Sequence, residues 1–463
     1  MKVLLVKPYN LSDHIQPSLG LGMLASAIRH KHEVEILDCI KESIKINKFR
    51  GRVERFMPQV VGFQTYTFDL DFVKEALRIC KEIDTQTVTI VGGPHPSGAP
   101  EETMRFFNKN LNFAFGGEAE IGLPLLLERI ERGTELKDIK DIPGLIWRHE
   151  EKVIVNDKIY VQDLDKLGMP TWDLIHPETY PESQHGAFYR KFPIAPLMLT
   201  RGCPFSCTFC MAHLVSGKKL RKRSAEHVLE EIKILYNDHG IREFHIVDDN
   251  FTMNKEYAKS FLLKLIDSGL DISWAVPNGI RADTLDEEML DLMKQSGLYL
   301  ISIGIESGSE RILKLMKKGV TTEEIRKRVK LIRRAGLEAA GFFILGFPSE
   351  TKEEMESTIR FSLELDLLRA NFFTYLPFPG TESYQQLLDN DEIRKVDWHR
   401  FFFMNAAYVP EGMTRKKLKN LQRKAFFRFF LRPKILYKNL KSVKSLRHLG
   451  FLIKRFYHWI IMC

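Results

Sequence analysis

The chain of 463 residues lacks any long hydrophobic run, and its last 52 residues contain no acidic side chain. No stretch reaches the roughly 18 uninterrupted apolar residues that a membrane-spanning helix needs. The segment Met1–Pro8 is too short and too charged for a signal peptide and predicts a buried strand. The expected location is the cytoplasm, and peripheral contact with the inner face of the membrane is a further hypothesis for the tail.

Cysteine is scarce as well, and six in so long a chain exclude a disulfide scaffold. We expect the scattered Cys39, Cys80 and Cys463 to act as small hydrophobic side chains. The other three cysteines lie within eight residues of one another. This grouping predicts a chemical role.

Charge is unevenly distributed along the chain. The net charge is +9, from 69 basic and 60 acidic residues. Residues 412–463 contain 15 Lys and Arg, which leaves 54 basic against 60 acidic residues, a net of −6, for residues 1–411. The body of the protein is therefore mildly acidic, and the excess positive charge belongs to the tail.

Short apolar runs alternate with stretches of helical spacing over the first 130 residues. This rhythm predicts a parallel, doubly wound sheet with helices on both faces, a Rossmann-like α/β domain over residues 1–132. The expected strands are Val3–Val6, Val34–Leu37, Val60–Phe63, Val88–Val91 and Phe113–Phe115, and the expected helices are Leu19–Ile28, Phe72–Ile83, Ala99–Asn108 and Ile121–Ile130. In such sheets, ligands bind at the carboxyl ends of the strands.

The rest of the chain divides into three parts. Residues 133–190 predict a linker with a hairpin around Glu150–Glu151. Residues 191–405 resume the strand–helix rhythm and predict a partial (β/α)6 barrel of the TIM type. Its expected strands are 195–200, 243–248, 272–276, 299–305, 340–345 and 370–376. Residues 406–463 form a basic helical tail.

The grouped cysteines, Cys203, Cys207 and Cys210, follow an apolar strand with the spacing Cys-x3-Cys-x2-Cys. Thiolates bind iron–sulfur clusters, which normally take four ligands. Three local cysteines therefore leave one iron open to a small molecule. The alternative is a structural zinc site, which needs a fourth ligand such as His213.

The cysteine spacing, with Phe209 before the last cysteine, resembles the signature of the radical S-adenosylmethionine superfamily. Further motifs of that superfamily follow in the expected order at the ends of the predicted strands. They are Val247–Phe251, Ile303–Ser309, Gly341–Pro348 with Glu350–Thr351, and Tyr375–Thr381. Four motifs in order behind the cysteine triplet favour the cluster over zinc.

By this resemblance the three cysteines hold a [4Fe–4S] cluster that cleaves S-adenosylmethionine to a 5′-deoxyadenosyl radical, which removes hydrogen from an unactivated carbon. The resemblance also implies S-adenosylmethionine contacts from Phe209, Asp249, Asn250, Glu306, Ser307 and Gly346. The Asp249–Asn250 pair departs from the commoner Gly-Gly-Glu. A core aromatic remains the alternative role for Phe209, and a barrel ion pair the alternative for Glu306.

The front domain resembles the cobalamin-binding domain of cobalamin-dependent radical enzymes. The matching pieces are Pro17–Leu21, Val61–Thr65, Val91–His95 and Gly116–Glu118. The histidine motif Asp-x-His-x-x-Gly is missing, since Asp13 and His14 are adjacent, so cobalt takes no ligand from that motif. The resemblance implies that cobalamin is held by Gln64, Thr65, Tyr66, Gly92, Gly93, Gly116, Gly117 and Glu118. A Rossmann-like domain that has lost its cofactor is the alternative.

The tail repeats apolar residues at three- and four-residue steps between Lys and Arg, at Leu436, Leu440, Val443, Leu446, Leu449 and Ile453. A basic amphipathic helix without acidic residues suits an anionic membrane surface. Packing on the barrel and, less favoured, nucleic-acid binding are the other interpretations.

The resemblance implies a cobalamin-dependent methyltransferase, most simply one that methylates an unactivated carbon of a small or lipid-like substrate. Methylcobalamin would deliver the methyl group to the substrate radical. Oxidative cyclisation or rearrangement without methyl transfer, or methylthio transfer to tRNA, are the alternatives. The expected partners are that substrate and a reducing protein such as flavodoxin or ferredoxin.

Overall fold

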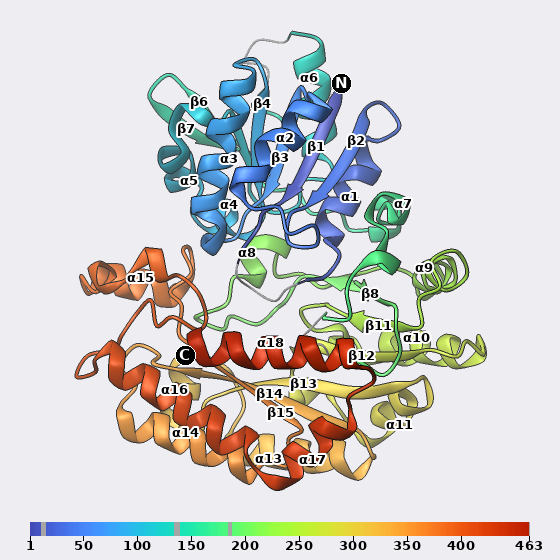
Figure 1. Cartoon of the computed structure of the whole chain (residues 1–463), viewed down its shortest axis with the longest axis vertical. Coiled ribbons are helices and arrows are strands. Elements are labelled where there is room, and N and C mark those ends of the chain that lie inside the picture. The colour runs from blue at the N-terminus through green and yellow to red at the C-terminus, as the bar shows by residue number, and fades with distance from the viewer. Residues whose placement is uncertain (11–14, 134–138, 184–187, 463) are drawn as a thin grey trace.

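The structure is a computed structural model that describes residues 1–10, 15–133, 139–183 and 188–462. It consists of a front domain above a six-stranded half-barrel, with helix α8 (Ala212–Ser216) between them (Figure 1). The tail helices run over the barrel side. Asp13, His14 and Cys463 lie outside the described residues.

The front domain contains a seven-stranded sheet in the order β2-β1-β3-β4-β5-β6-β7, of which the first five strands are parallel. The strands are β1 (Lys2–Lys7), β2 (Glu33–Asp38), β3 (Val60–Gln64), β4 (Val88–Gly92), β5 (Phe113–Phe115), β6 (Leu145–His149) and β7 (Lys152–Val155). The helices are α1 (Leu19–Ile28), α2 (Ile46–Phe56), α3 (Leu70–Ile83), α4 (Pro94–Gly98), α5 (Pro100–Phe107) and α6 (Gly122–Glu131). The doubly wound sheet is confirmed, whereas α2 was missing from the prediction.

Alternation along the central strands produces two apolar faces, because successive side chains of a strand point to opposite sides. In β1, Leu4 and Val6 pack in the cluster that contains Phe49 of α2. Val3 and Leu5 pack in the cluster on the other face, with α1 and α6. The parallel strands thus read as continuous hydrophobic runs because both faces are covered.

The hairpin expected around Glu150–Glu151 is present, but it extends the front sheet instead of belonging to a separate linker. β6 pairs antiparallel with β5, the edge strand of the parallel part. Trp147 of β6 is fully buried, and its indole N–H donates to Asn156. Because β6 pairs with β5 and β7 pairs with β6, the front sheet extends past residue 132 to β7.

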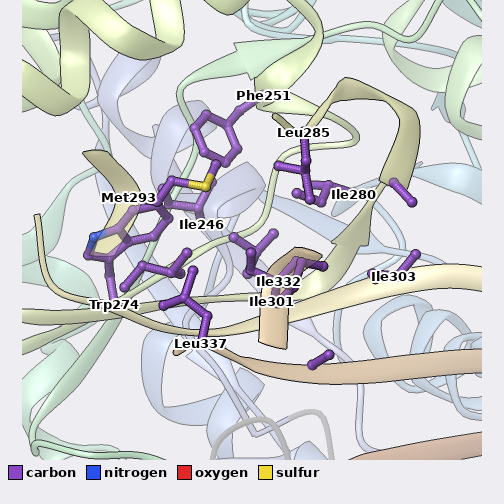
Figure 2. Close-up of a cluster of buried hydrophobic side chains, with 14 of the residues drawn as sticks. Ile246, Phe251, Trp274, Ile280, Leu285, Met293, Ile301, Ile303, Ile332 and Leu337 are labelled. Carbon is purple, nitrogen blue, oxygen red and sulfur yellow. The ribbon is translucent and has the colours of Figure 1, made fainter. Parts of the chain in front are cut away.

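The second sheet is the predicted half-barrel of six parallel strands in the order β15-β14-β13-β12-β11-β8. Its strands are β8 (Ile194–Leu197), β11 (Glu243–Ile246), β12 (Ser273–Ile280), β13 (Leu298–Glu306), β14 (Glu338–Leu345) and β15 (Arg369–Thr374). The helices around it are α9 (Ala225–Asp238), α10 (Lys255–Asp267), α11 (Glu287–Gln295), α12 (Glu310–Leu315), α13 (Thr322–Arg334), α14 (Lys352–Glu364) and α15 (Glu382–Asp389). Figure 2 shows part of the core between this sheet and its helices, where Trp274 and Phe251 lie edge to face.

Two short strands, β9 (Thr200–Arg201) and β10 (Arg221–Lys222), pair antiparallel and close the cysteine loop between them. Cys203, Cys207, Cys210 and α8 all lie in this loop. The loop faces the carboxyl ends of the front strands, because α8 packs against α4. Both halves of the protein therefore present their functional ends to a shared interior.

The tail consists of α16 (Arg415–Phe430), α17 (Pro433–Lys441) and α18 (Leu446–Met462). α16 packs on β15 and α14 through the buried Leu418, Ala425 and Phe429, so the packing interpretation is correct for this helix. α18 runs between the segment before β8 and α16, with ring contacts Tyr189–His448 and Phe426–Phe456. None of the described helices is long and apolar enough to cross a membrane.

Candidate functional site

A cavity of about 300 Å3 opens at the carboxyl ends of the front strands, opposite the cysteine loop. Six of the eight predicted cobalamin residues line it, namely Gln64, Tyr66, Gly92, Gly93, Gly117 and Glu118. From the barrel side, Arg201, Val215 and Ser216 line the same cavity. The cavity is thus a space shared between both halves.

Glycine leaves this cavity open at three of its strand and helix ends. A Cβ at Gly20 would meet no atom within 4 Å, and one at Gly92 would approach only Phe115, at 4.0 Å. Gly93 has φ +106°, a conformation that favours glycine, and brings the loop against the backbone of Thr65. Ser18, the N-cap of α1, donates to Gln64 at 2.7 Å and fixes its amide beside the opening. The chain therefore provides a glycine-lined opening at which a cofactor could approach the backbone closely.

Two predicted cobalamin residues do not line the cavity. Thr65 is fully buried, and its backbone N–H donates to Gly92 in the neighbouring strand. Gly116 lies behind Lys158, whose Cε would be 3.1 Å from a Cβ there. Both residues therefore support the cradle from behind.

His95, next to the glycine pair of β4, is also turned away from the cavity. It is buried in α4, and its Nδ1 lies 3.0 Å from the Thr67 hydroxyl. Burial lowers the pKa of His95 to about 4, so the imidazole is neutral near pH 7. The structure gives this histidine a structural contact in the front domain.

Glu118 of the front domain forms ion pairs with two arginines of the barrel side. Its carboxylate accepts from both terminal nitrogens of Arg221, at 2.6 and 2.8 Å, and lies 3.5 Å from Arg201. Glu120 pairs with Arg201 at 2.7 Å. Burial lowers and the two carboxylates raise the pKa of Arg201, with a net rise that keeps it charged. Two acids from the front domain thus hold both strands, β9 and β10, that flank the cysteine loop.

The three cysteine side chains are partly buried and lie near one another, close enough for mutual electrostatic effects. Burial raises the pKa of Cys203, and it raises that of Cys210 to about 12. Within the described residues, no three His, Cys, Asp or Glu side chains converge closely enough for one metal ion. An iron–sulfur cluster fits this spacing, since each thiolate would then ligate a different iron.

The three polar residues after β11, Asp248, Asp249 and Asn250, differ in burial and in their hydrogen-bond partners. Asp248 is buried and accepts from the backbone N–H groups of Leu199 and Thr200, at 2.8 and 2.7 Å. Asn250 is buried as well, and its oxygen accepts from the Thr252 hydroxyl. Asp249 is exposed and lies near the thiols of Cys203 and Cys210. Of the two predicted contacts, Asp249 is the side chain open to a ligand.

Glu306 ends β13 with φ +64°, an uncommon value for a residue other than glycine. Its carboxylate pairs with Lys318 at 2.8 Å, and both side chains are buried. Burial lowers and Glu306 raises the pKa of Lys318, with a net rise that also includes the nearby Cys207. Glu306 therefore forms the ion pair that was the alternative to a cofactor contact, and this pair lies beside the cysteine loop.

The other residues predicted to contact S-adenosylmethionine, Ser307, Gly346 and Phe209, lie against other parts of the protein. The Ser307 hydroxyl is fully buried and lies 3.1 Å from that of Thr358. Gly346 has φ +82°, and a Cβ there would meet Leu418 of α16 at 2.9 Å. Phe209 is partly buried against an aromatic cluster that includes Tyr375.

Sequence reasoning missed two cations at the site, Arg281 and Lys158. Arg281 stacks on Phe205 of the cysteine loop at 3.7 Å and donates to the carbonyl of Lys318 at 2.6 Å. Lys158 donates to Ser97 and Leu214, one in each half of the protein. The sequence gives little indication of these two residues. Single basic residues are common, and the residues that they contact are far away in the chain.

Residues 197–362 match the Radical SAM superfamily, and residues 12–127 match the B12 binding domain. An "uncharacterized methyltransferase", PH0819 of Pyrococcus horikoshii, is 34% identical over 98% of this chain and 97% of its own length. The chain belongs to the cobalamin-dependent radical S-adenosylmethionine enzymes. The cytidylyl-2-hydroxyethylphosphonate methyltransferase of Streptomyces wedmorensis is 29% identical over 84% of this chain and 82% of its own.

Among solved structures, the cobalamin-dependent radical enzyme OxsB, with aqua-cobalamin and S-adenosylmethionine bound, has a TM-score of 0.74 at 19% identity. The match covers 100% of this chain and 71% of OxsB. Family membership gives this radical S-adenosylmethionine enzyme a [4Fe–4S] cluster, S-adenosylmethionine and cobalamin as cofactors. The cysteine loop and the glycine-lined cavity have the donor set and the shape that these groups require.

Proposed function

We propose that this enzyme methylates an unactivated carbon of a small or lipid-like substrate. Both relatives described above carry the word methyltransferase in their names. The observation that carries the proposal is the shared space: Arg201, two residues before the first cluster cysteine, lines the cavity of the front domain. The cavity thus adjoins the cysteine loop, and we place the substrate between them.

The bound cofactors supply hydrogen abstraction and the methyl group. The chain's own residues hold and orient them. Cys203, Cys207 and Cys210 ligate the cluster, and Asp249 is the side chain proposed for the amino group of S-adenosylmethionine. Gly20, Gly92 and Gly93 make room for the corrin, and Gln64, Gly117 and Glu118 form its polar surroundings.

Aromatic side chains from both halves meet next to Tyr66, which lines the cavity and stacks on Phe68 at 5.2 Å, and they support a hydrophobic substrate. Phe68 of the front domain lies 6.4 Å from Phe403, and Phe403 lies 5.1 Å from Phe373 of β15. Phe373 stacks on Phe342 of β14 at 5.9 Å. All four phenylalanine rings are partly exposed. Such a lining binds apolar groups and excludes water from a reactive intermediate.

The test uses the reconstituted enzyme with S-adenosylmethionine labelled in its methyl group, a chemical reductant, and fractions of a cell extract. Methyl transfer to carbon forms both S-adenosylhomocysteine and 5′-deoxyadenosine, together with label in one extract component. Cyclisation or rearrangement forms 5′-deoxyadenosine without S-adenosylhomocysteine, and that product pattern in every fraction would overturn the proposal. We also propose flavodoxin or ferredoxin as the electron donor, and either protein should replace the chemical reductant.

A further inference from the structure

The most exposed large apolar side chains of the described residues all lie in the tail. Tyr437, Leu440, Leu446, Ile453 and Tyr457 are 60–88% exposed, more than any other large apolar side chain described. Before the tail, no described large apolar side chain is more than 56% exposed. Isolated exposed apolar residues are ordinary, but several on two consecutive helices need an explanation.

Helical spacing places these residues on one face of each helix. Tyr437 and Leu440 are three residues apart in α17, and in α18 Leu446 is followed by Ile453 and Tyr457 at steps of seven and four. Both spacings return to the same side of an α-helix. The five residues are called the outer face below.

Packing on the barrel does not account for the outer face. The opposite side of α18 makes the contacts with the enzyme body, where His448 is 1% exposed and its ring lies 4.9 Å from that of Tyr189. Phe456 meets Phe426 of α16 at 5.8 Å. His448 and Phe456 thus hold α18 on the enzyme body, while the five residues of the outer face remain 60–88% exposed.

The charge around the outer face is of one sign. Lys441, Lys444, Arg447 and Lys454 are all exposed between its apolar residues. Residues 412–463 contain 15 basic residues and no acidic one. A partner surface that complements this patch must combine negative charge with an apolar interior.

We propose that the outer face of α17 and α18 docks the enzyme on an anionic lipid bilayer. Aliphatic side chains insert at the boundary between headgroups and acyl chains, tyrosines suit the interface, and lysines meet the anionic headgroups. A second copy of this chain fits poorly, because a two-fold contact would bring two basic patches together. Nucleic acid would use the lysines but has no need of exposed leucine and isoleucine. The proposal does not depend on methyl transfer.

The test is sedimentation of the full-length reconstituted enzyme with vesicles. One set of vesicles is pure phosphatidylcholine, and the other contains phosphatidylglycerol as well. We expect binding to the anionic vesicles that weakens with salt, and the triple variant Leu440→Ser/Leu446→Ser/Ile453→Ser should lower it about tenfold or more. The variant Lys441→Gln/Lys444→Gln/Lys454→Gln should lower binding to anionic vesicles only.

A matched control is available on the enzyme body. Leu263, Leu315 and Leu388 are 40–48% exposed and belong to other surfaces, so their triple replacement by serine should leave vesicle binding unchanged. Unchanged iron content verifies that each variant folds. Equal binding of all variants, or no binding, overturns the proposal. So does a dimer in solution, or bound RNA, that the tail variants abolish while vesicle binding is absent.

Discussion

Glu118, at the end of the front sheet, and Arg221, in the strand that closes the cysteine loop, form a buried two-point ion pair. Both guanidinium nitrogens donate to the carboxylate, and the side chains are 9% and 2% exposed. The residues are 103 positions apart in the chain. This pair ties the cavity of the front domain to the cysteine loop.

The first prediction concerns this pair. Glu118→Gln leaves Arg221 buried without its countercharge, and breaking a buried pair from one side costs about 3–5 kcal/mol. We expect a loss of that size in the free energy of unfolding, measured in urea, together with lower retention of both iron and cobalt. Glu101→Gln is the matched control, because its pair with Arg105 is exposed and contributes about 0–1 kcal/mol. Equal effects of the two variants would contradict the role given to Glu118.

The second prediction concerns the cluster ligands. Ser in place of Cys203, Cys207 or Cys210 should remove most of the iron and sulfide bound after anaerobic reconstitution, because the hydroxyl does not replace the thiolate. Cys80→Ala is the control: Cys80 is fully buried in the core of the front domain, far from the loop in the fold. It should lower stability and leave iron unchanged. Full iron in any of the three serine variants would remove that cysteine from the ligand set.

The third prediction distinguishes an effect on cobalamin binding in the cavity from an effect on folding. Gly20 and Gly51 are both helical, and a Cβ at either would meet no atom within 4 Å, but only Gly20 lines the cavity. Gly20→Leu should weaken cobalamin binding by about 1–3 kcal/mol, or roughly 5- to 100-fold, because the side chain fills the space of the cofactor. Gly51→Leu should bind cobalamin normally. Iron content should be normal in both, and equal cobalamin affinity in both would place the cofactor elsewhere.

The fourth prediction is a pH dependence. The pKa of His95 is about 4 in the folded protein, against about 6.5 for an unperturbed histidine. Between these values the unfolded chain binds a proton at His95 that the folded chain does not, so the contribution of His95 to stability falls by about 2–4 kcal/mol as pH falls from about 6.5 to about 4. His95→Gln should flatten this part of the curve of unfolding free energy against pH. His176→Gln, at an exposed histidine, should leave it in place.

Much of this architecture could be predicted from local sequence. Buried parallel strands form apolar runs, and α1 has the predicted bounds of Leu19–Ile28. The cysteine spacing and the strand-end glycines pointed to the cysteine loop and to the cavity of the front domain. Helix α2 was missed although Ile46, Phe49 and Val53 have helical spacing, because its other residues are mostly polar.

Other parts depend on contacts that no local pattern encodes. Thr65 is polar and stands at a strand end, yet its hydroxyl turns back to the carbonyl of Phe63. The β6–β7 hairpin was expected, but which sheet it joins depends on the free edge of β5. Glu306 was left between two roles, and only the position of Lys318, set by the turn after α12, brings the ion pair together. Long-range pairing of charges is decided by the fold as a whole.

The most direct test of the account is a metal count on one sample. The enzyme is reconstituted anaerobically with iron, sulfide and hydroxocobalamin, passed through a desalting column, and measured for bound iron, sulfide and cobalt. The account predicts about four irons per chain, as one [4Fe–4S] cluster requires, together with about one cobalt. About four irons without cobalt would contradict the shared two-cofactor site and leave the front domain as a scaffold for the radical barrel.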